Sequence, residues 1–307
     1  MFKKILFATS ASPACDNAAK VAFDLARRNG AKLYVFHVMG VPSRGFSHMV
    51  RDLRSGEEEH ADGDYRDWVV EELQSTYAEQ MEGFEKNTSI ELAVGVPHTE
   101  VLRFARQNDV DLIVMGANTR EDDPGAARTR SIIGNTMQRV ARVARCPVLI
   151  VNRPCTTCWN LFSNIVFCTD FSKAADSAFK FALSAAREVN ARLYLFHAFD
   201  INASRLGVFP GQAELERTLE KAHAQMQERY LSHMGDFDNY QVDIWEGTPY
   251  VEILKYARER KADLVVMAHH TKEVNPDQAE IGSTVEQVVL RSACPVASVV
   301  HPDKVAA

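Results

Sequence analysis

The sequence lacks the uninterrupted apolar run of about 18 residues that a membrane-spanning helix needs. Its six cysteines in 307 residues do not make a disulfide framework of the kind that stabilises small secreted domains. Basic residues are not in surplus either, because 35 Lys and Arg stand against 41 Asp and Glu, a formal net charge of −6. A broad nucleic-acid-binding surface is therefore not expected. With 46% hydrophobic and 25% charged residues, the composition is that of a globular chain of about two domains.

The first residues superficially resemble an export signal, because two lysines precede an apolar stretch and small residues follow it. That apolar stretch, residues 5–8, is shorter than the roughly 7–15 residues that such a signal requires. We therefore expect a strand at this position. The corresponding expectation for the whole protein is a cytoplasmic location, with neither a membrane nor nucleic acid as a partner.

The chain contains two copies of one long pattern. The matching segments, first copy and then second, are 4–10 with 164–170, 31–37 with 191–197, 95–97 with 247–249, 111–115 with 263–267 and 146–148 with 294–296. The offset between the copies falls from 160 to 152 and then to 148 residues. The first copy thus carries two insertions, between 38 and 95 and between 116 and 134. A period this long indicates that each copy is a domain rather than a solenoid repeat.

Short apolar runs alternate with helical patterns in each copy. The runs predicted as strands in the first copy are 5–8, 33–38, 90–94, 112–115 and 148–151. Several are apolar throughout, which is typical of strands covered on both faces. Strands separated by helices predict an α/β fold, with a parallel, doubly wound sheet and right-handed crossovers in each domain.

Two helices can be placed from caps and apolar stripes, and two more from charged segments. Asp16 is the predicted N-cap of a helix that ends near Gly30, and the second copy repeats this pattern from Asp176. Residues 57–86 are highly charged and predict a helix preceded by a flexible loop. The corresponding stretch of the second copy is 212–233.

We expect a first domain at 1–153, a linker at 154–163 and a second domain at 164–307. The connector is short, so the two domains are expected to pack together as an intramolecular pseudo-dimer. The predicted contact involves the final strands, 148–151 and 296–300, because exposed edges of this apolarity pair readily. Dimerisation of whole chains stays open.

The ordered set of segments resembles the universal stress protein family in its tandem form, with two copies in one chain. The residues that carry the resemblance are the opening strand with 169–172, the Leu-Tyr-x-Phe-His and Asp-Leu-(Ile/Val)-Val-Met strands, 134–136, 282–284 and the two Cys-Pro-Val segments. The resemblance implies a five-stranded parallel sheet of order 3-2-1-4-5 in each domain, with helices on both faces. It also implies contact through the last strands, a role in stress response or signalling and, in many members, ATP binding.

A ligand site can also be argued from the sheet itself. Ligands of open parallel sheets bind beyond the carboxyl ends of the strands, where the strand order reverses. A helix starting at Gly282 would present free backbone N–H groups and a partial positive charge there, which suits a phosphate. Ser283 and Thr284 add hydroxyl donors. Ser283 as a simple helix cap is the alternative, and the two roles are compatible.

The nucleotide signature of the family, Gly-x2-Gly-x9-Gly-(Ser/Thr), is incomplete in both copies. In the first copy Thr119 stands at the second glycine and the following loop is too long. In the second copy Ala268 and Thr271 stand at the first two glycines. A residue other than glycine costs roughly 1–2 kcal/mol where the backbone is left-handed, so we expect an altered loop rather than loss of the site.

The acidic residue after strand one, which lies against the nucleoside in ATP-binding relatives, is Asp170 in the second copy and is replaced by Ser10 in the first. We therefore expect ATP or another adenine nucleotide as ligand, with the second copy the better binder. The residues expected to contact it are Asp170, Gly282, Ser283 and Thr284 in the second copy and Gly116, Gly134, Asn135 and Thr136 in the first.

Cys155 and Cys158 form the only cysteine pair at a spacing typical of metal or redox sites. A zinc site would need two more ligands, and a redox pair normally opens a helix after a strand. We favour packing in the linker, and the metal and redox alternatives stay open. The other cysteines are expected to be structural.

Histidines and arginines near the expected site also admit two interpretations. His269-His270 would suit phosphate or a metal, but neighbouring ligands are not evident, so no metal is expected. The arginines of the first-copy loop, Arg120, Arg128 and Arg130, would suit an anion, although a solvated loop neutralised by adjacent acids is favoured. His37 and His197 are expected to line the pocket rim or to pack.

Three functions remain in competition. The favoured one is a nucleotide-binding stress or signalling protein that acts through ligand-dependent conformation and contacts with an unknown protein partner. The second is a scaffold or interaction protein with degenerate nucleotide sites. The third is an enzyme that uses the cysteine or histidine pair. The sequence contains no P-loop, magnesium motif or general-base constellation, so at most a weak ATPase is expected and no catalytic residue is named.

Overall fold

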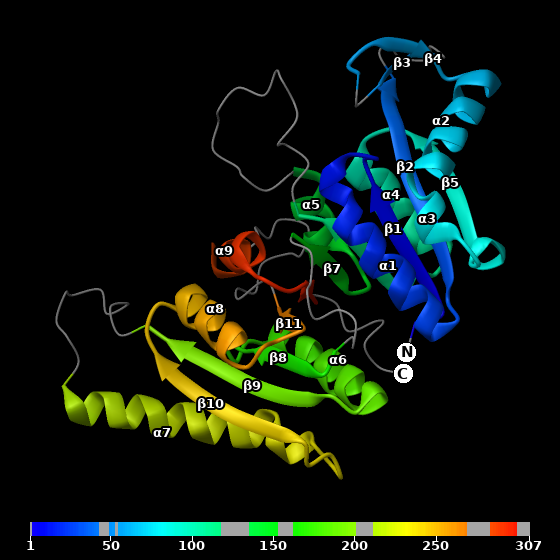
Figure 1. Ribbon diagram of the computed structural model, residues 1–307. Coiled ribbons are helices and arrows are strands. Elements are labelled where there is room, and N and C mark those ends of the chain that lie inside the picture. Colours follow the sequence, from blue (N-terminus) through cyan, green and yellow to red (C-terminus); the bar gives the residue numbers. More distant parts are fainter. Residues whose placement is uncertain are drawn as a thin grey trace. The chain divides into compact units, whose positions relative to one another are not determined.

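The computed structural model describes residues 2–42, 49–52, 55–117, 135–152, 162–200, 211–268 and 283–299. The chain divides into two compact units, Met1–Asn152 and Arg153–Ala307. Figure 1 shows the strands and helices of each unit. No helix in the described ranges combines the length and apolarity needed to cross a lipid bilayer.

The core of the first unit is a five-stranded parallel sheet. Its strands are β1 (Lys4–Thr9), β2 (Lys32–Pro42), β5 (Thr88–Val94), β6 (Leu112–Gly116) and β7 (Val148–Val151). They are arranged in the order β5-β2-β1-β6-β7, which in chain order is the predicted 3-2-1-4-5. β6 and β7 are buried along their whole length. Their apolar runs are explained by this burial, because helices cover both faces of the sheet.

The helices of the first unit lie in two layers. They are η1 (Pro13–Cys15), α1 (Asp16–Asn29), α2 (Gly63–Thr76), α3 (Ala78–Met81), η2 (Glu85–Asn87), α4 (Pro97–Gln107) and α5 (Asn135–Val143). α1 contacts α3, and α4 contacts α5. Right-handed crossovers from this strand order place α1 and α2 on one face of the sheet and α4 and α5 on the other (Figure 1).

The second unit repeats this architecture. Its strands are β8 (Asn164–Cys168), β9 (Arg192–Phe199), β10 (Tyr240–Glu246), β11 (Leu264–Met267) and β12 (Val296–Ser298). Their order, β10-β9-β8-β11-β12, is again 3-2-1-4-5. Its helices are α6 (Lys173–Val189), α7 (Gln212–Arg229), η5 (Leu231–His233), α8 (Pro249–Glu259) and α9 (Ser283–Arg291). The predicted fold class is therefore confirmed in both copies.

The predicted N-caps, Asp16 and Asp176, are wrong. α1 does begin at Asp16, but its N-cap is Cys15, which makes no side-chain cap bond, and η1 precedes it. In the second unit the N-cap is Ser172, whose Oγ accepts a hydrogen bond from the backbone N–H of Ala175 at 3.3 Å. Ser172 lies four residues before Asp176, and either side chain could accept a hydrogen bond from the first turn of the helix. Here the serine is the N-cap.

The predicted loop before the charged helix contains two strands. β3 (Met49–Asp52) pairs antiparallel with the end of β2, and β4 (Glu58–His60) pairs with β3. The pairing depends on Asp52, whose carboxylate accepts from the Ser55 N–H at 2.7 Å and from the hydroxyl of Tyr65 on α2. The charged helix is present as α2 and α3, but it starts at Gly63 and not at Glu57, because residues 58–60 form β4. Among the described residues, the second unit has no counterpart of β3 and β4.

An aspartate before the fourth strand ties together the amino ends of two strands in each unit. Oδ2 of Asp263 accepts from the backbone N–H groups of Ser163 and Asn164, both at 2.9 Å. Oδ2 of Asp111 does the same for Lys3 and Lys4, also at 2.9 Å. The aspartate of the repeated Asp-Leu-(Ile/Val)-Val-Met segment is therefore structural.

We predict that Asp263→Ala lowers the free energy of unfolding of the second unit by about 1.5–3 kcal/mol, because hydrogen bonds to a carboxylate are lost and buried donors remain. Urea denaturation measures the change. Asp238→Ala, at an exposed turn position, is the matched control and should change stability by less than about 0.5 kcal/mol. Equal effects of the two substitutions would contradict the structural role.

Candidate functional site

The candidate site of each unit lies at the carboxyl ends of its first and fourth strands, where the strand order reverses. Of the predicted contact residues, Asp170, Thr284, Gly116 and Thr136 are described in full. α9 begins at Ser283 and α5 begins at Asn135, but the side chains of these two residues lie outside the described part. The remaining two, Gly282 and Gly134, lie outside the described residues altogether.

In the second unit, the loop after β8 is held by its own polar side chains. The hydroxyl of Thr169 accepts from the Phe171 N–H at 2.9 Å, and Oδ1 of Asp170 accepts from the Ser172 N–H at 2.9 Å. Phe171 has a left-handed backbone (φ 61°), which is strained for a bulky side chain. Asp170 is exposed, and its Oδ2 makes no hydrogen bond to any described residue. The loop thus presents one carboxylate oxygen to solvent at the switch point.

An aromatic surface lies beside that carboxylate. The ring of Phe171 is 4.4 Å from the ring of His197 and lies nearly parallel to Tyr230, at 6.2 Å and 17°. Nδ1 of His197 donates to the carbonyl of Thr169 at 2.8 Å. Burial lowers the pKa of His197, against the opposing effects of this hydrogen bond and of Asp170. The imidazole is therefore neutral at pH 7, and the site has an aromatic side and an anionic side.

In the first unit, the loop after β1 has the same backbone conformation but different side chains. Ala11 has the same left-handed conformation (φ 56°), and its N–H donates to the Thr9 hydroxyl at 2.9 Å. Ser10 replaces the carboxylate, and its Oγ lies 3.0 Å from the Ser12 Oγ and 3.4 Å from the Cys15 Sγ. Neither an acid nor an aromatic ring stands at these two loop positions. This loop offers a nucleoside only weaker, neutral groups.

Gly116 has a packing role at the end of β6. A Cβ at this position would lie 2.9 Å from the carbonyl oxygen of Ala14 in η1, so the loop after β1 approaches the backbone here as closely as glycine allows. Ala268 occupies the equivalent position of the second unit, where no such short 3-10 helix precedes α6. The predicted role of Gly116 in nucleotide binding stays a prediction, and packing alone explains its identity.

A buried threonine–tyrosine pair, absent from the sequence-based expectations, lies beneath each loop. The hydroxyls of Thr9 and Tyr77 are 2.5 Å apart, and those of Thr169 and Tyr230 are 2.6 Å apart. Both tyrosines are fully buried, and desolvation raises the pKa of Tyr230 to about 12, so the phenol stays protonated. We call Thr169 with its partners Tyr230, His197 and Phe171 the threonine junction.

The two tyrosines are 153 residues apart, close to the offset of the neighbouring repeats. That spacing is the signal that would have found them, together with the pattern Tyr-x3-Met-x2-Phe that begins at each tyrosine. The matching histidines were expected to line a rim or to pack. His37 packs, since it is buried and its Nδ1 donates to the Thr9 carbonyl at 2.9 Å.

In the second unit, an ion pair between α7 and α6 supports the loop after β8. Nη2 and Nε of Arg229, at the end of α7, contact Oδ2 and Oδ1 of Asp176 at 2.7 and 3.2 Å. Nη2 also donates to the carbonyl of the capping residue, Ser172, at 3.3 Å. The fork of the guanidinium suits this two-point contact. The first unit has Thr76 at the matching position, and its hydroxyl donates to the Glu72 carbonyl instead.

A family model described as the universal stress protein family matches residues 1–152 and 161–299. The chain belongs to the universal stress protein family. The two matched segments correspond to the two copies found in the sequence, as in tandem members of the family.

Individual relatives agree with this. A universal stress protein of Methanocaldococcus jannaschii is 28% identical over 160 residues, which are 50% of this chain and 84% of that protein. A universal stress protein of Archaeoglobus fulgidus matches with a TM-score of 0.63 at 20% identity, over 97% of this chain and 98% of its own. A protein of unknown function from Pseudomonas aeruginosa matches with a TM-score of 0.59 at 17% identity, over 99% and 94%. Likeness at these identities shows the fold.

Several groups of interest lie outside the described residues, namely Cys155, Cys158, His269, His270 and the arginines of the first-unit loop. The remaining cysteines, Cys15, Cys146, Cys168 and Cys294, are buried thiols that take part in no disulfide. Among the residues that the structure places, no group of three or more His, Cys, Asp or Glu side chains is arranged to hold a metal ion.

We predict that Tyr230→Phe lowers the stability of the second unit by about 1–2 kcal/mol, because a buried hydrogen bond to Thr169 is lost without a change in packing volume. Tyr240→Phe, on the half-exposed start of β10, is the control. Urea denaturation of both variants measures the difference. Identical midpoints would show that the hydroxyl pair contributes nothing to stability.

Proposed function

We propose that the second unit binds an adenine nucleotide, ATP or a close relative, at the carboxyl end of its sheet. In this proposal the protein acts in stress response or signalling through ligand-dependent changes in conformation and in contacts with a protein partner. The observation that carries the proposal is the exposed carboxylate of Asp170, held at the switch point beside the Phe171 ring. The proposal includes no catalytic step.

The proposed contacts follow from the chemistry of each group. Oδ2 of Asp170 accepts hydrogen bonds from the nucleoside, and the Phe171 ring gives the base an apolar neighbour. The phosphates lie at the start of α9, where the N–H groups of the first turn have no partner within the helix. Thr284 lies in that first turn and is half-buried, so its hydroxyl adds a donor.

The second unit is the better binder because it has the charged acceptor. A hydrogen bond to a charged group contributes about 1.5–3 kcal/mol, and Ser10 of the first unit offers only a neutral hydroxyl, already close to Ser12. The strain expected at Ala268 does not oppose this, because neither Ala268 nor Gly116 at the matching position has a left-handed backbone. The charged acceptor therefore decides the difference between the units.

Calorimetric titration of the full chain with ATP tests the assignment. Asp170→Ala is expected to weaken binding about tenfold or more, and Gly282→Val to weaken it as well. Ser10→Ala, at the matching position of the first unit, should leave the affinity unchanged. If Asp170→Ala and Gly282→Val both bind as the wild type does, the second-unit site is wrong. If Gly134→Val alone abolishes binding, the first unit holds the ligand.

We predict that Arg229→Met weakens ATP binding about threefold to tenfold, because the loop carrying Asp170 loses its contact with α7. Arg187→Met is the matched control on the same unit, since Arg187 donates to the Met234 carbonyl at 2.6 Å and pairs with Asp236, away from the loop. Backbone amide exchange at Phe171 and Ser172 should become faster in the first variant only. An unchanged affinity would mean that the loop holds its shape without the ion pair.

The alternative is a scaffold whose nucleotide sites no longer bind. It is favoured by the incomplete signature in both units and by the packing role of Gly116. If neither ATP nor AMP binds to the wild-type chain in the titration, and neither copurifies with it, the scaffold is the better description.

A further inference from the structure

The first unit has a strongly acidic face. Residues 57–72, from β4 through most of α2, contain eight carboxylates and a single arginine. Those that are exposed are Glu57, Glu58, Asp62, Asp64, Asp67 and Glu71. We call these six residues the acidic face. With eight carboxylates and one arginine, this short segment has a net charge of −7, whereas the whole chain has −6.

The same unit has a basic face on α4 and α5. It consists of Arg103, Arg106, Arg139, Arg142 and Arg145, the last of which lies two residues after the end of α5. The only acidic residue within the two helices is Glu100, which is buried and paired with Arg103. Nη1 of Arg139 lies 3.4 Å from Nε2 of His98, and the Nε of Arg142 is buried without a hydrogen-bond partner among the described residues. Burial, with Arg139 and Arg142 nearby, lowers the pKa of His98. Of these five arginines, only Arg103 has an ion-pair partner in the described part of the chain.

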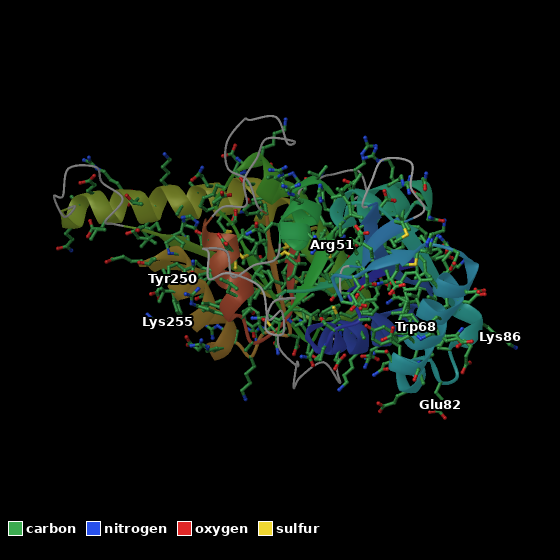
Figure 2. The ribbon with its side chains drawn as sticks, turned by 90° about the horizontal axis from the view of Figure 1, so that it is seen from above. Arg51, Trp68, Glu82, Lys86, Tyr250 and Lys255 are labelled. Carbon is green, nitrogen blue, oxygen red and sulfur yellow. The ribbon has the colours of Figure 1, made fainter. Side chains whose placement is uncertain are left out.

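The second unit shows that the fold does not require this charge. α8 carries two acidic and two basic residues, and α9 carries one of each. Tyr250 stands at the position of His98, with the Arg291 guanidinium 5.8 Å from its ring centroid. Lys255 pairs with Glu252 at 2.8 Å. Tyr250 and Lys255, both on α8, are labelled in Figure 2.

An aromatic pair, of which Trp68 is exposed and Tyr65 is half-buried, lies within the acidic face. Trp68 on α2 is 55% exposed, and its ring is stacked on Tyr65, with 6.0 Å between centroids. Tyr65 is fixed by the hydrogen bond that its hydroxyl donates to Asp52. In Figure 2, Trp68 lies toward the same end of the first unit as Lys86. A rigid, exposed tryptophan ringed by charge is typical of the centre of a protein interface.

We propose that the acidic face of one copy of this protein docks on the basic face of a second copy. α2 and α4–α5 lie on opposite faces of one sheet, so the two charges cannot neutralise each other within the unit. Two different surfaces in contact make a heterologous interface, which repeats into a ring or an open chain. The contact does not depend on the proposed nucleotide site.

Sedimentation velocity of the full chain in 20 mM and 500 mM NaCl tests the proposal. The weight-average mass is expected to rise with protein concentration in low salt and to fall in high salt, because the Debye length shortens from about 20 Å to about 4 Å. Arg106→Glu with Arg139→Glu, both exposed, should weaken the association at least about tenfold. Arg217→Glu with Arg258→Glu, which makes the same charge change on exposed positions of the second unit, should not.

A charge exchange identifies the partner surface. Glu58→Arg with Asp67→Arg should also abolish association, and an equimolar mixture with the Arg106→Glu, Arg139→Glu variant should restore it, because each then has one native face left to pair. A mass that is constant with concentration in low salt overturns the proposal. So does association that none of these exchanges alters, since the contact would then lie on another surface.

Discussion

The geometry of the candidate site depends on one buried threonine at the end of the first strand. The Thr169 hydroxyl bonds to the Tyr230 hydroxyl and to the Phe171 N–H, and its carbonyl accepts from His197. These bonds connect the loop to a helix end and to the next strand at a single residue. Because all of these groups are buried or half-buried, an unmade bond would cost about 1–3 kcal/mol. The loop therefore has one favoured conformation before any ligand arrives.

The two copies share this junction and differ around it. Thr9, Tyr77 and His37 repeat it in the first unit, but the neighbouring loop residues are Ser10 and Ala11. The first unit instead has an added antiparallel pair and opposite charges on its two faces. The conserved junction preserves the fold of each unit, and the residues outside it give each unit its own surface chemistry.

The strands could be predicted because apolar runs of four to eight residues are typical of buried parallel strands, and because the same runs occur in both copies. The position of the site followed from strand order alone. The N-caps of the helices could not be predicted in the same way. Ser172 and Asp176 are equally good caps in a sequence, and only the structure distinguishes them. β3 and β4 were missed because their residues are polar and their pairing depends on the Tyr65–Asp52 contact.

The contacts of Asp170 also could not be predicted from the sequence. The sequence identified the residue, but the hydrogen bond to Ser172 and the ring of Phe171 beside it come from the left-handed backbone, which no local pattern predicts. Tyr230 was missed because it lies in a charged segment, although it repeats Tyr77 at an offset of 153 residues. Long-range contacts of single residues thus account for most of what sequence reasoning did not find.

The attachment of α7 to the loop has a mechanical consequence. Its last residue, Arg229, contacts Ser172 and Asp176, and the next residue, Tyr230, contacts Thr169. The 18 residues of α7 span about 27 Å, so a tilt of about 5° at this end moves the other end by about 2 Å. Because α7 follows the carboxyl end of β9, its amino end lies on the carboxyl side of the sheet as well (Figure 1), so a small displacement of the loop would be enlarged there.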